Sequence, residues 1–377
     1  MIGIYCNHTS IFPHNTGIQR CVRATAAALN NQDELIVPLV WNQIKNSFCL
    51  ANQKALEHLR LWGGTPVDSW CLQLPPRGSW IVVIELISGP NQPSQSQLRA
   101  SADDNGWKLL AVFHDDIPLS WAGVSAKFHS KYMLGLANYN MVLATSSSTR
   151  IALEKFWYQN GLFSVKTKLI ALALAAEIPA VPRKYSQPIN LSDPLRLLFV
   201  GSLEPRKNHA ALFKAMVWLQ AHSELFFNLV LVGWPNNIEV LAKLERAQAI
   251  GLPIVYEGVV SDDYLVELYA NSNLSIYPSL LEGFGLPVLE SCWMGTPCIA
   301  SAVPALLDHK GITGCYVLDK LDWFSIASAL LCLQRNQDIL LQLNDNVNKM
   351  ELKSWCEYAS NLLANIQKYD NFLKFEL

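Results

Sequence analysis

Two glutamates that flank a glycine-containing turn are the residues of this chain best suited to chemistry. Seven residues separate Glu282 from Glu290 in the segment Glu-Gly-Phe-Gly-Leu-Pro-Val-Leu-Glu. The glycines would let backbone amides approach a ligand, and Pro287 suits the first turn of a helix, where its missing N–H needs no partner. Such a helix N-terminus binds anions, and the carboxylates could bind hydroxyl groups on either side of a phosphate. The segment therefore indicates a nucleotide-sugar pocket, whereas two surface glutamates near a turn would be the ordinary alternative.

A basic pair forms the second group of candidate residues. The apolar run Leu195–Gly201 predicts a strand, Ser202 follows it, and Arg206 and Lys207 come just before a predicted helix. Arginine offers a planar pair of donors to two phosphate oxygens, and lysine adds a mobile point charge. The pair therefore suits a diphosphate leaving group. An ordinary basic helix start is the alternative, although the helix dipole disfavours cations at that end.

The paired glutamates resemble a motif of the large retaining glycosyltransferase family with the GT-B fold, glycosyltransferase family 4. This resemblance implies that Glu282 contacts hydroxyls of the donor sugar and that Glu290 holds the ribose of the nucleotide. It also implies that the backbone between them contacts the diphosphate. The residues expected to make that contact are Gly283, Phe284, Gly285 and Leu286.

The Pro-Arg-Lys segment resembles the basic motif of the same family. The resemblance implies that Arg206 and Lys207 bind the donor's phosphates and neutralise charge as the sugar–phosphate bond breaks. Many members carry an additional arginine directly after the strand glycine, Gly201, where this chain has Ser202. Binding of the diphosphate is therefore expected to depend more heavily on the basic pair.

Shorter segments resemble other parts of the family's donor site. The segment after Gly258 resembles the loop that borders the base, with backbone near Val260 reading the base edge, while Ser261 or Asp262 also suits a helix N-cap. Uridine is favoured as the base by the family alone.

Two segments of the first half complete the expected site. Gly17 lies in a segment that resembles the family's glycine loop, whose backbone approaches the donor phosphate. His114 and Asp115 end a predicted strand, and a similar pair in relatives lies beside the donor sugar. A histidine at a strand end is also often structural. Five tryptophans could stack on acceptor sugars or simply fill the core: Trp62, Trp70, Trp80, Trp107 and Trp121.

The order of predicted elements indicates an α/β fold. Short apolar runs alternate with helical patterns, which is typical of parallel sheets. A proline-rich segment over 179–194 predicts a linker between two Rossmann-like doubly wound domains, an acceptor domain at 1–178 and a donor domain at 195–354. Ligands of such folds bind at the carboxyl ends of the strands. The final Ser-Trp-x-x-x-Ala pattern resembles the closing helix of GT-B enzymes, so a helix over about 355–377 is expected to cross back to the first domain.

Composition sets further limits. The chain has 377 residues, of which 51% are hydrophobic and 16% charged, and this is typical of a folded chain of two domains. Its net charge of −2 gives no reason to expect a nucleic-acid partner. Residues 1–180 carry 14 basic and 11 acidic side chains, and the rest carry 15 and 20. The mildly basic first half suits an anionic lipid-linked acceptor or a membrane surface, although ordinary scatter explains it equally well.

The nine cysteines lie mostly in apolar runs without any C-x-x-C pair, which favours free thiols in a reducing cytoplasm. The chain starts with a predicted strand at Ile2 and shows no signal-peptide pattern. The longest apolar stretch, 169–176, is too short to span a bilayer. We therefore expect a cytoplasmic protein, with peripheral membrane contact at the inner face as a possibility.

The motifs of several other enzyme classes are absent from the sequence. The sequence has no Asp-x-Asp, no G-x-G-x-x-G after the first strand, no Walker A loop and no G-x-S-x-G. We expect a retaining, metal-independent transferase without a cofactor. It would move a hexose from a nucleotide sugar, with UDP-glucose favoured, to a saccharide or lipid-linked acceptor in polysaccharide or envelope glycan synthesis. A catalytically silent sugar-nucleotide-binding partner in a glycan-assembly complex, or a disaccharide synthase or phosphorylase of the same fold, are the alternatives.

Overall fold

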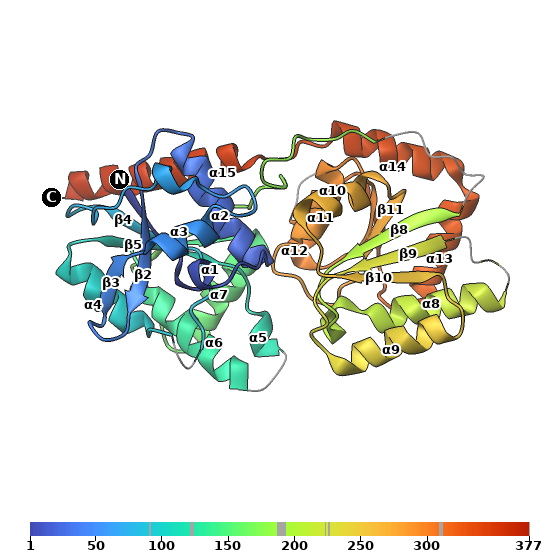
Figure 1. Cartoon of the computed structure of the whole chain (residues 1–377). Helices are drawn as coiled ribbons and strands as arrows, with labels where there is room; N and C mark the ends of the chain where they lie inside the picture. Colours follow the sequence, from blue (N-terminus) through green and yellow to red (C-terminus); the bar gives the residue numbers. More distant parts are fainter. Residues whose placement is uncertain are drawn as a thin grey trace. The chain divides into compact units, whose positions relative to one another are not determined.

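A computed structural model of the chain describes residues 1–89, 92–120, 124–186, 194–222, 224, 227–308 and 312–376. The chain divides into two compact units. Unit 1 comprises Met1–Ala175 together with Lys353–Leu377, and unit 2 comprises Ala176–Leu352. Both are built from a sheet with helices around it (Figure 1).

Unit 1 contains a seven-stranded sheet in the order β3-β2-β1-β4-β5-β6-β7. Its strands are β1 (Ile2–Tyr5), β2 (Ile36–Asn42), β3 (Ser47–Leu50), β4 (Trp80–Val83), β5 (Lys108–Phe113), β6 (Met141–Ala144) and β7 (Lys168–Ala171). The edge strand β3 pairs with β2 in the antiparallel sense, whereas the other pairs are parallel. Strands β1, β4 and β6 are buried along their whole length, as expected for parallel strands covered on both faces. The strand order reverses between β1 and β4, which makes this a doubly wound sheet.

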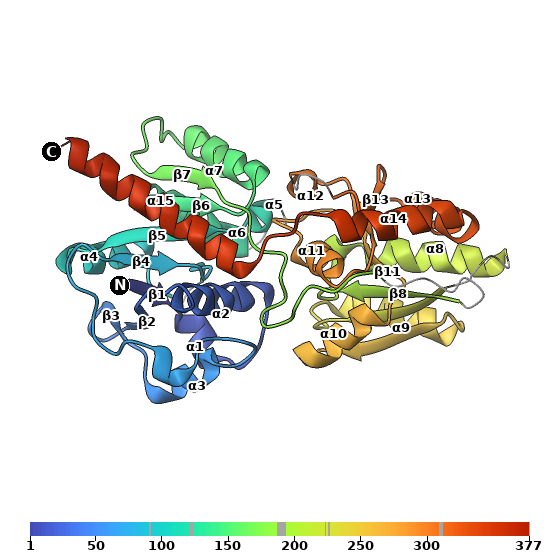
Figure 2. The same cartoon turned by 90° about the horizontal axis from the view of Figure 1, so that it is seen from above.

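The helices of unit 1 include the last helix of the chain. They are α1 (Asn7–Ile11), α2 (Gly17–Asn30), α3 (Gln53–Leu59), α4 (Gln95–Asp104), α5 (Ile117–Ser120), α6 (Val124–Gly135), α7 (Ser147–Gln159) and α15 (Trp355–Glu376), with the short 3₁₀ turns η1 (Val67–Ser69) and η2 (Leu136–Asn138). Helix α15 packs against α2 (Figure 2). Its Tyr358, Ala359 and Leu362 are buried, and its Asp370 accepts a hydrogen bond from Trp80 Nε1 at 3.1 Å. The predicted return of the last helix to the first domain is therefore confirmed.

Unit 2 contains a six-stranded parallel sheet in the order β10-β9-β8-β11-β12-β13. Its strands are β8 (Leu195–Val200), β9 (Phe227–Val232), β10 (Ile254–Gly258), β11 (Leu274–Tyr277), β12 (Cys298–Ser301) and β13 (Cys315–Leu318). Its helices are η3 (Pro205–Lys207), α8 (His209–Ala221), α9 (Ile238–Ala249), α10 (Asp262–Ala270), α11 (Leu286–Trp293), α12 (Pro304–Leu307), α13 (Trp323–Arg335) and α14 (Gln337–Lys349). Leu212 and Met216 of α8 and Leu330 of α13 pack into one core with the sheet. Two doubly wound Rossmann-like domains, as the sequence predicts, are thus confirmed.

The proline-rich segment lies partly outside the described residues, since 187–193 are not described. Its earlier part runs along unit 2. The indole of Trp293 donates to Val181 O at 2.9 Å, Lys184 N donates to Trp293 O at 2.9 Å, and Ser186 N donates to Asn348 Oδ1 at 2.7 Å. These contacts attach the segment up to Ser186 to helices α11 and α14.

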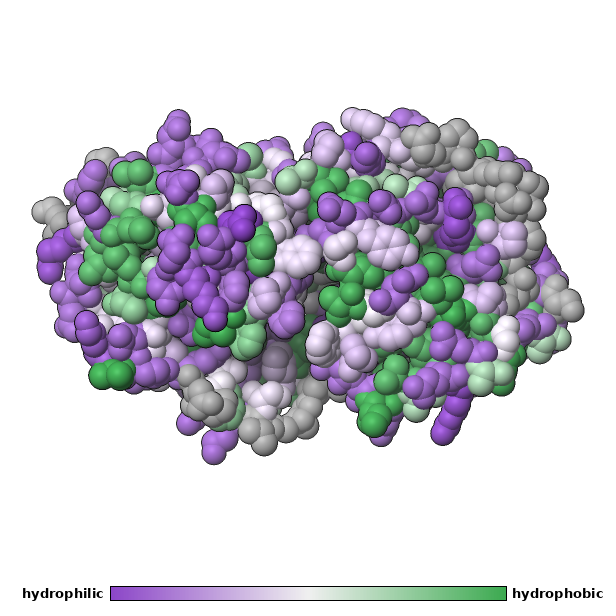
Figure 3. Space-filling model, viewed as in Figure 1, coloured by the Kyte–Doolittle hydropathy of each residue, from purple (hydrophilic) through white to green (hydrophobic). Residues whose placement is uncertain are grey.

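Other surface and core features bear on the sequence-based expectations. All nine cysteines are free thiols. Three of the five tryptophans are buried in unit 1, which fits the interpretation that they fill the core: Trp70, Trp80 and Trp107. The indole of Trp62 donates a hydrogen bond to Pro13 O. Trp121 lies outside the described residues. Over the described part of the chain, no helix combines the length and apolar character needed to cross a membrane. Hydrophilic and hydrophobic residues are mixed over the face drawn in Figure 3.

A buried histidine begins helix α8 of unit 2, two residues after Lys207. His209 is 1% exposed, and its ring lies 4.2 Å from that of Phe199, measured between ring centroids. Burial, together with the smaller effect of the neighbouring Lys207 ammonium, lowers the pKa of His209 to about 3. The imidazole is therefore neutral in the folded protein at neutral pH.

Replacing the buried Leu362 of α15 by alanine should destabilise unit 1 by about 2–5 kcal/mol, because it removes apolar contacts and leaves a cavity. Scanning calorimetry measures the change. Leu341→Ala, at a position that is 53% exposed, is the matched control and should have little effect. Equal effects of the two changes would contradict the packing of α15.

The stability of unit 2 should fall as the pH is lowered from about 6.5 towards 3. The unfolded chain protonates His209 near its ordinary pKa of 6.5, whereas the folded protein resists protonation until about pH 3. At pH 5 this one group should reduce the free energy of unfolding by about 2 kcal/mol. Urea unfolding at pH 7 and pH 5 measures this difference in the free energy of unfolding. The difference of about 2 kcal/mol should disappear in His209→Phe and should persist in the control His222→Phe. An unchanged dependence in His209→Phe would contradict the assignment.

Candidate functional site

The turn between β11 and α11 carries the first predicted motif. Gly285 has φ +85°, and a Cβ atom there would lie 2.2 Å from Leu306 Cδ2, so only glycine fits without displacement. Leu286 starts the helix, and Pro287 lies in its first turn as predicted. The turn therefore delivers the chain to the helix N-terminus in a conformation that depends on this glycine.

The turn after β8 carries the second motif and is attached to the first. Asn208 adopts a left-handed conformation with φ 62°, and its Nδ2 donates to Pro278 O at 3.1 Å and to Leu321 O at 2.8 Å. Leu280 N donates to Arg206 O at 2.7 Å. Because these bonds join the two turns, the side chains on them are held at fixed positions relative to one another.

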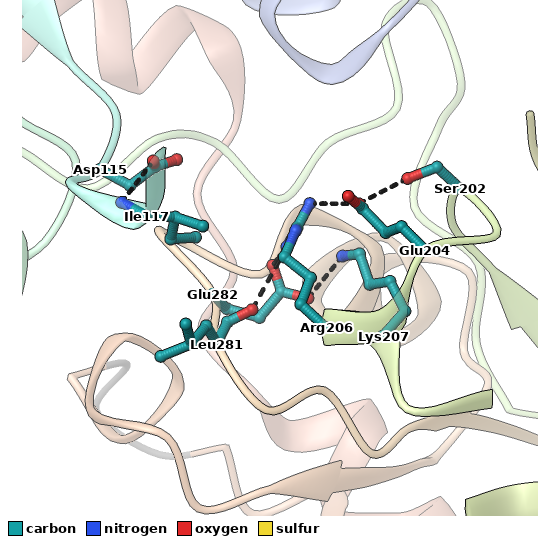
Figure 4. Close-up of polar contacts among 8 residues, drawn as sticks. All are labelled: Asp115, Ile117, Ser202, Glu204, Arg206, Lys207, Leu281 and Glu282. Carbon is teal, nitrogen blue, oxygen red and sulfur yellow. Dashed lines mark hydrogen bonds and ion pairs between the residues drawn. The ribbon is translucent and has the colours of Figure 1, made fainter. Parts of the chain in front are cut away.

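Three of the predicted residues come together between these turns. Lys207 Nζ lies 2.5 Å from Glu282 Oε1, and Arg206 Nη1 lies 3.4 Å from Glu282 Oε2 (Figure 4). Arg206 Nη1 also donates to Leu281 O at 3.2 Å. The side chains of Lys207 and Glu282 are only 7% and 10% exposed. The basic pair and the first glutamate, 75 residues apart in sequence, thus form one buried charge cluster.

Burial alone would raise the pKa of Glu282. The Lys207 ammonium and the Arg206 guanidinium outweigh this effect and hold that pKa below its ordinary value. Glu282 is therefore ionised at neutral pH. Such a cluster can bind a polyanion through its cations and hydroxyl groups through its carboxylate.

Glu204 is a member of the site that sequence reasoning missed. Its Oε1 lies 2.7 Å from Arg206 Nη2 and accepts a hydrogen bond from Ser202 Oγ at 2.7 Å (Figure 4). The guanidinium of Arg206 is thus held between two carboxylates. A carboxylate two residues before the basic pair was the available signal, and Asn208, with its backbone-bridging amide, was also missed.

The remaining predicted residues of unit 2 occupy the same loops and helices. Glu290 lies in α11 and is 3% exposed, and Phe284 is 6% exposed. Gly201 follows β8, and Gly283 lies in the turn before α11. Val260 lies half-buried between β10 and α10, where Ser261 accepts a hydrogen bond from Tyr264 N and is the N-cap of α10.

The predicted residues of unit 1 are fixed by local hydrogen bonds. Gly17 is the first residue of α2, behind the capping residue Thr16. His114 Nε2 lies 2.7 Å from Ile84 O, which requires the proton on that nitrogen, and burial lowers the pKa of this ring. Asp115 Oδ1 accepts from Ile117 N at 3.1 Å at the start of α5 (Figure 4). Roles of these residues toward a donor sugar stay predictions.

A resident metal ion would need a group of ligands. Within the described ranges, no three His, Cys, Asp or Glu side chains gather as such a site requires. The acidic side chains of the charge cluster face lysine and arginine instead.

Comparison with protein families supports the resemblance noted in the sequence. Residues 183–349, nearly all of unit 2, match the family model described as Glycosyl transferases group 1.

Curated relatives match over part of their length. The chain is 30% identical over 224 residues to the serotype-specific mannosyltransferase WbdA of Escherichia coli, covering 56% of this chain and 27% of the relative. It is 31% identical over 239 residues to O-antigen chain mannosyltransferase B of Escherichia coli, covering 59% of this chain and 60% of the relative. The matched stretch therefore spans about a quarter of the first relative and three-fifths of the second.

Solved structures show the same fold over nearly the whole chain. A sucrose-phosphate synthase from Thermosynechococcus elongatus superimposes with a TM-score of 0.68 at 16% identity, over 97% of this chain and 98% of that one. HepE from Anabaena, in complex with UDP and glucose, superimposes with a TM-score of 0.67 at 12% identity, over 97% and 99%. The second unit of the chain therefore matches the glycosyl transferases group 1 family, and the two units together have the fold of GT-B structures.

Proposed function

We propose that this chain is a retaining glycosyltransferase that works without a metal ion. It moves a hexose from a nucleoside-diphosphate sugar to a saccharide or lipid-linked acceptor in the synthesis of a polysaccharide or envelope glycan. The observation that carries the proposal is the buried cluster of Arg206, Lys207 and Glu282 beside the glycine turn of α11. Its cations suit a diphosphate, and its carboxylate suits sugar hydroxyls.

Mannose is the hexose that the relatives favour. The relatives at 30–31% identity are named mannosyltransferases, whereas the structure complexed with UDP and glucose is only 12% identical to this chain. We therefore place a nucleoside-diphosphate mannose ahead of the UDP-glucose that the sequence favoured, with UDP-glucose as the alternative donor.

The proposed mechanism follows from the charges of the cluster. Arg206 and Lys207 bind the diphosphate, and amides of residues 283–286 at the start of α11 approach it. Positive groups already in place stabilise the charge that develops on the leaving diphosphate, without further reorganisation. As the phosphates attract the two cations, oxygens of Glu282 become available to hydroxyls of the donor sugar. Glu290 holds the ribose, and the leaving phosphate accepts the acceptor's proton.

Two alternatives remain as outcomes of experiment. In a silent binding partner, Glu204 and Glu282 would neutralise the basic pair, and nucleotide binding would occur without transfer. In a disaccharide synthase or phosphorylase, a free small sugar, a sugar phosphate or inorganic phosphate would be the co-substrate.

Lys207→Ala and Glu282→Ala should each lower kcat for hexose transfer by about 10²–10³-fold, because each removes a charged group aimed at the reacting centre. Circular dichroism and thermal melting verify folding, since removing one partner of a buried ion pair costs about 3–5 kcal/mol of stability. Lys243→Ala, at an exposed position of α9, is the matched control and should keep full activity. Full activity in folded Lys207→Ala would contradict the phosphate role.

Thermal melting with UDP, GDP, UDP-glucose, UDP-GlcNAc and GDP-mannose in EDTA should identify the donor. A ligand at 100 times its Kd stabilises the folded state by about 2.7 kcal/mol, which corresponds to roughly 5–10 °C for a domain of this size. Glu290→Gln should reduce the shift, whereas Glu245→Gln on the surface of α9 should not. Absence of a shift with every nucleotide would reject a donor site in this chain.

A further inference from the structure

A hollow of about 240 Å³ lies in unit 1 between α1, α3 and β2. Polar groups of its wall come from Asn7, Ser10, Asn52, Lys54 and His58, and apolar groups come from Ile11, Val40 and Ala55. Asn7 comes two residues after β1, beyond the carboxyl end of that strand. Doubly wound sheets bind ligands at this end of their strands.

Three polar side chains of the hollow are each anchored at one atom. Asn7 Oδ1 accepts from Trp41 N at 3.1 Å, Asn52 Oδ1 accepts from Ala55 N at 2.9 Å, and His58 Nδ1 lies 2.7 Å from Ser10 O. Only a ring N–H can bond to a carbonyl, so the proton of a neutral His58 resides on Nδ1.

The second polar atom of each of these side chains can form a hydrogen bond with a ligand. Among the residues that the structure describes, none forms a hydrogen bond with Asn7 Nδ2, Asn52 Nδ2 or His58 Nε2. Two amide donors and one imidazole acceptor are thus held in position without a protein partner. Such preorganised groups lose little conformational entropy when a ligand binds.

Hydrogen bonds also fix the backbone of the helix that lines the hollow. The buried carboxylate of Glu85 accepts from His8 N at 2.8 Å and from Thr9 N at 2.6 Å. These bonds fix α1, which supplies Asn7 and Ile11 to the hollow.

The lining matches the surface of a sugar ring. Hydroxyl groups both donate and accept hydrogen bonds, and the C–H face of a pyranose packs on aliphatic side chains such as Val40 and Ile11. No carboxylate and no aromatic ring other than the imidazole belongs to the described lining, so a nucleobase has nothing on which to stack. The volume is below the ~300–1,000 Å³ of pockets for drug-sized ligands, which indicates one ring.

We infer that this hollow binds one pyranose ring of the acceptor glycan. The inference rests on the proposed transferase function and specifies the class of its acceptor. Asn7 and Asn52 donate to ring hydroxyls, and His58 Nε2 accepts from one.

Ring-¹⁵N histidine NMR tests the inference directly, with methyl α-D-mannopyranoside and methyl α-D-glucopyranoside as probes. One glycoside should shift the His58 Nε2 resonance, identified by its loss in His58→Asn, while the Nδ1–H form persists. Asn7→Asp and Asn52→Asp keep the anchoring oxygen and remove the donor, and each should weaken the glycoside about tenfold. Asn42→Asp is the matched control, since Asn42 Oδ1 also accepts backbone N–H groups but lies outside the hollow.

Kinetics should agree with the NMR. With p-nitrophenyl α-D-mannopyranoside as acceptor, Asn52→Asp should raise the acceptor KM about tenfold and leave nucleotide binding unchanged. Absence of a His58 shift with both glycosides, or an equal shift in Asn52→Asp, would overturn the inference. Nucleotide binding without glycoside binding would leave the proposed function intact, whereas glycoside binding without any nucleotide binding would reject the proposed function alone.

Discussion

The ion pair between Lys207 and Glu282 is the interaction on which the organisation of the site depends. Both side chains are nearly buried, and a buried charge is costly unless a partner and hydrogen bonds compensate it. The partners come from the turns after β8 and β11, which are neighbouring strands of the sheet. The pairing therefore requires both strands to be in register before either charge can be buried, and the bonds of Asn208 and Leu280 hold the turns in that arrangement.

Ser202 follows the strand glycine, where the resemblance in the sequence led us to expect an arginine. Ser202, in that place, donates to Glu204, and Glu204 in turn pairs with Arg206. A guanidinium held at both of its terminal nitrogens has one orientation, with its remaining donors directed by its neighbours. These contacts therefore restrain the orientation of the Arg206 side chain.

The sequence predicted the fold well because parallel strands and proline positions leave strong local patterns. Both doubly wound sheets follow from such patterns, whereas the return of the last helix was expected from the resemblance to GT-B enzymes. The positions of Gly285 and Pro287 in a turn and a first helical turn could be predicted, because both depend on the local backbone conformation. The contact of Lys207 with Glu282 could not be predicted from the sequence, because it joins residues 75 positions apart. Glu204 left one signal, its position two residues before Arg206, but no spacing reveals the partners of the Asn208 amide. The ring orientation of His114 depends on the carbonyl of Ile84, which follows another strand. The roles of the site residues toward a donor stay predictions.

The position of α15 has a consequence for the order in which the molecule forms on the ribosome. The face of α2 that α15 covers belongs to the first 175 residues, but its cover is synthesised only after the whole of unit 2. At about 5–20 residues per second, that interval lasts roughly 10–40 seconds. During this time unit 2 can fold completely, whereas the face of α2 that later packs against α15 stays exposed to solvent. The first part of the chain to be made is therefore the last to be finished.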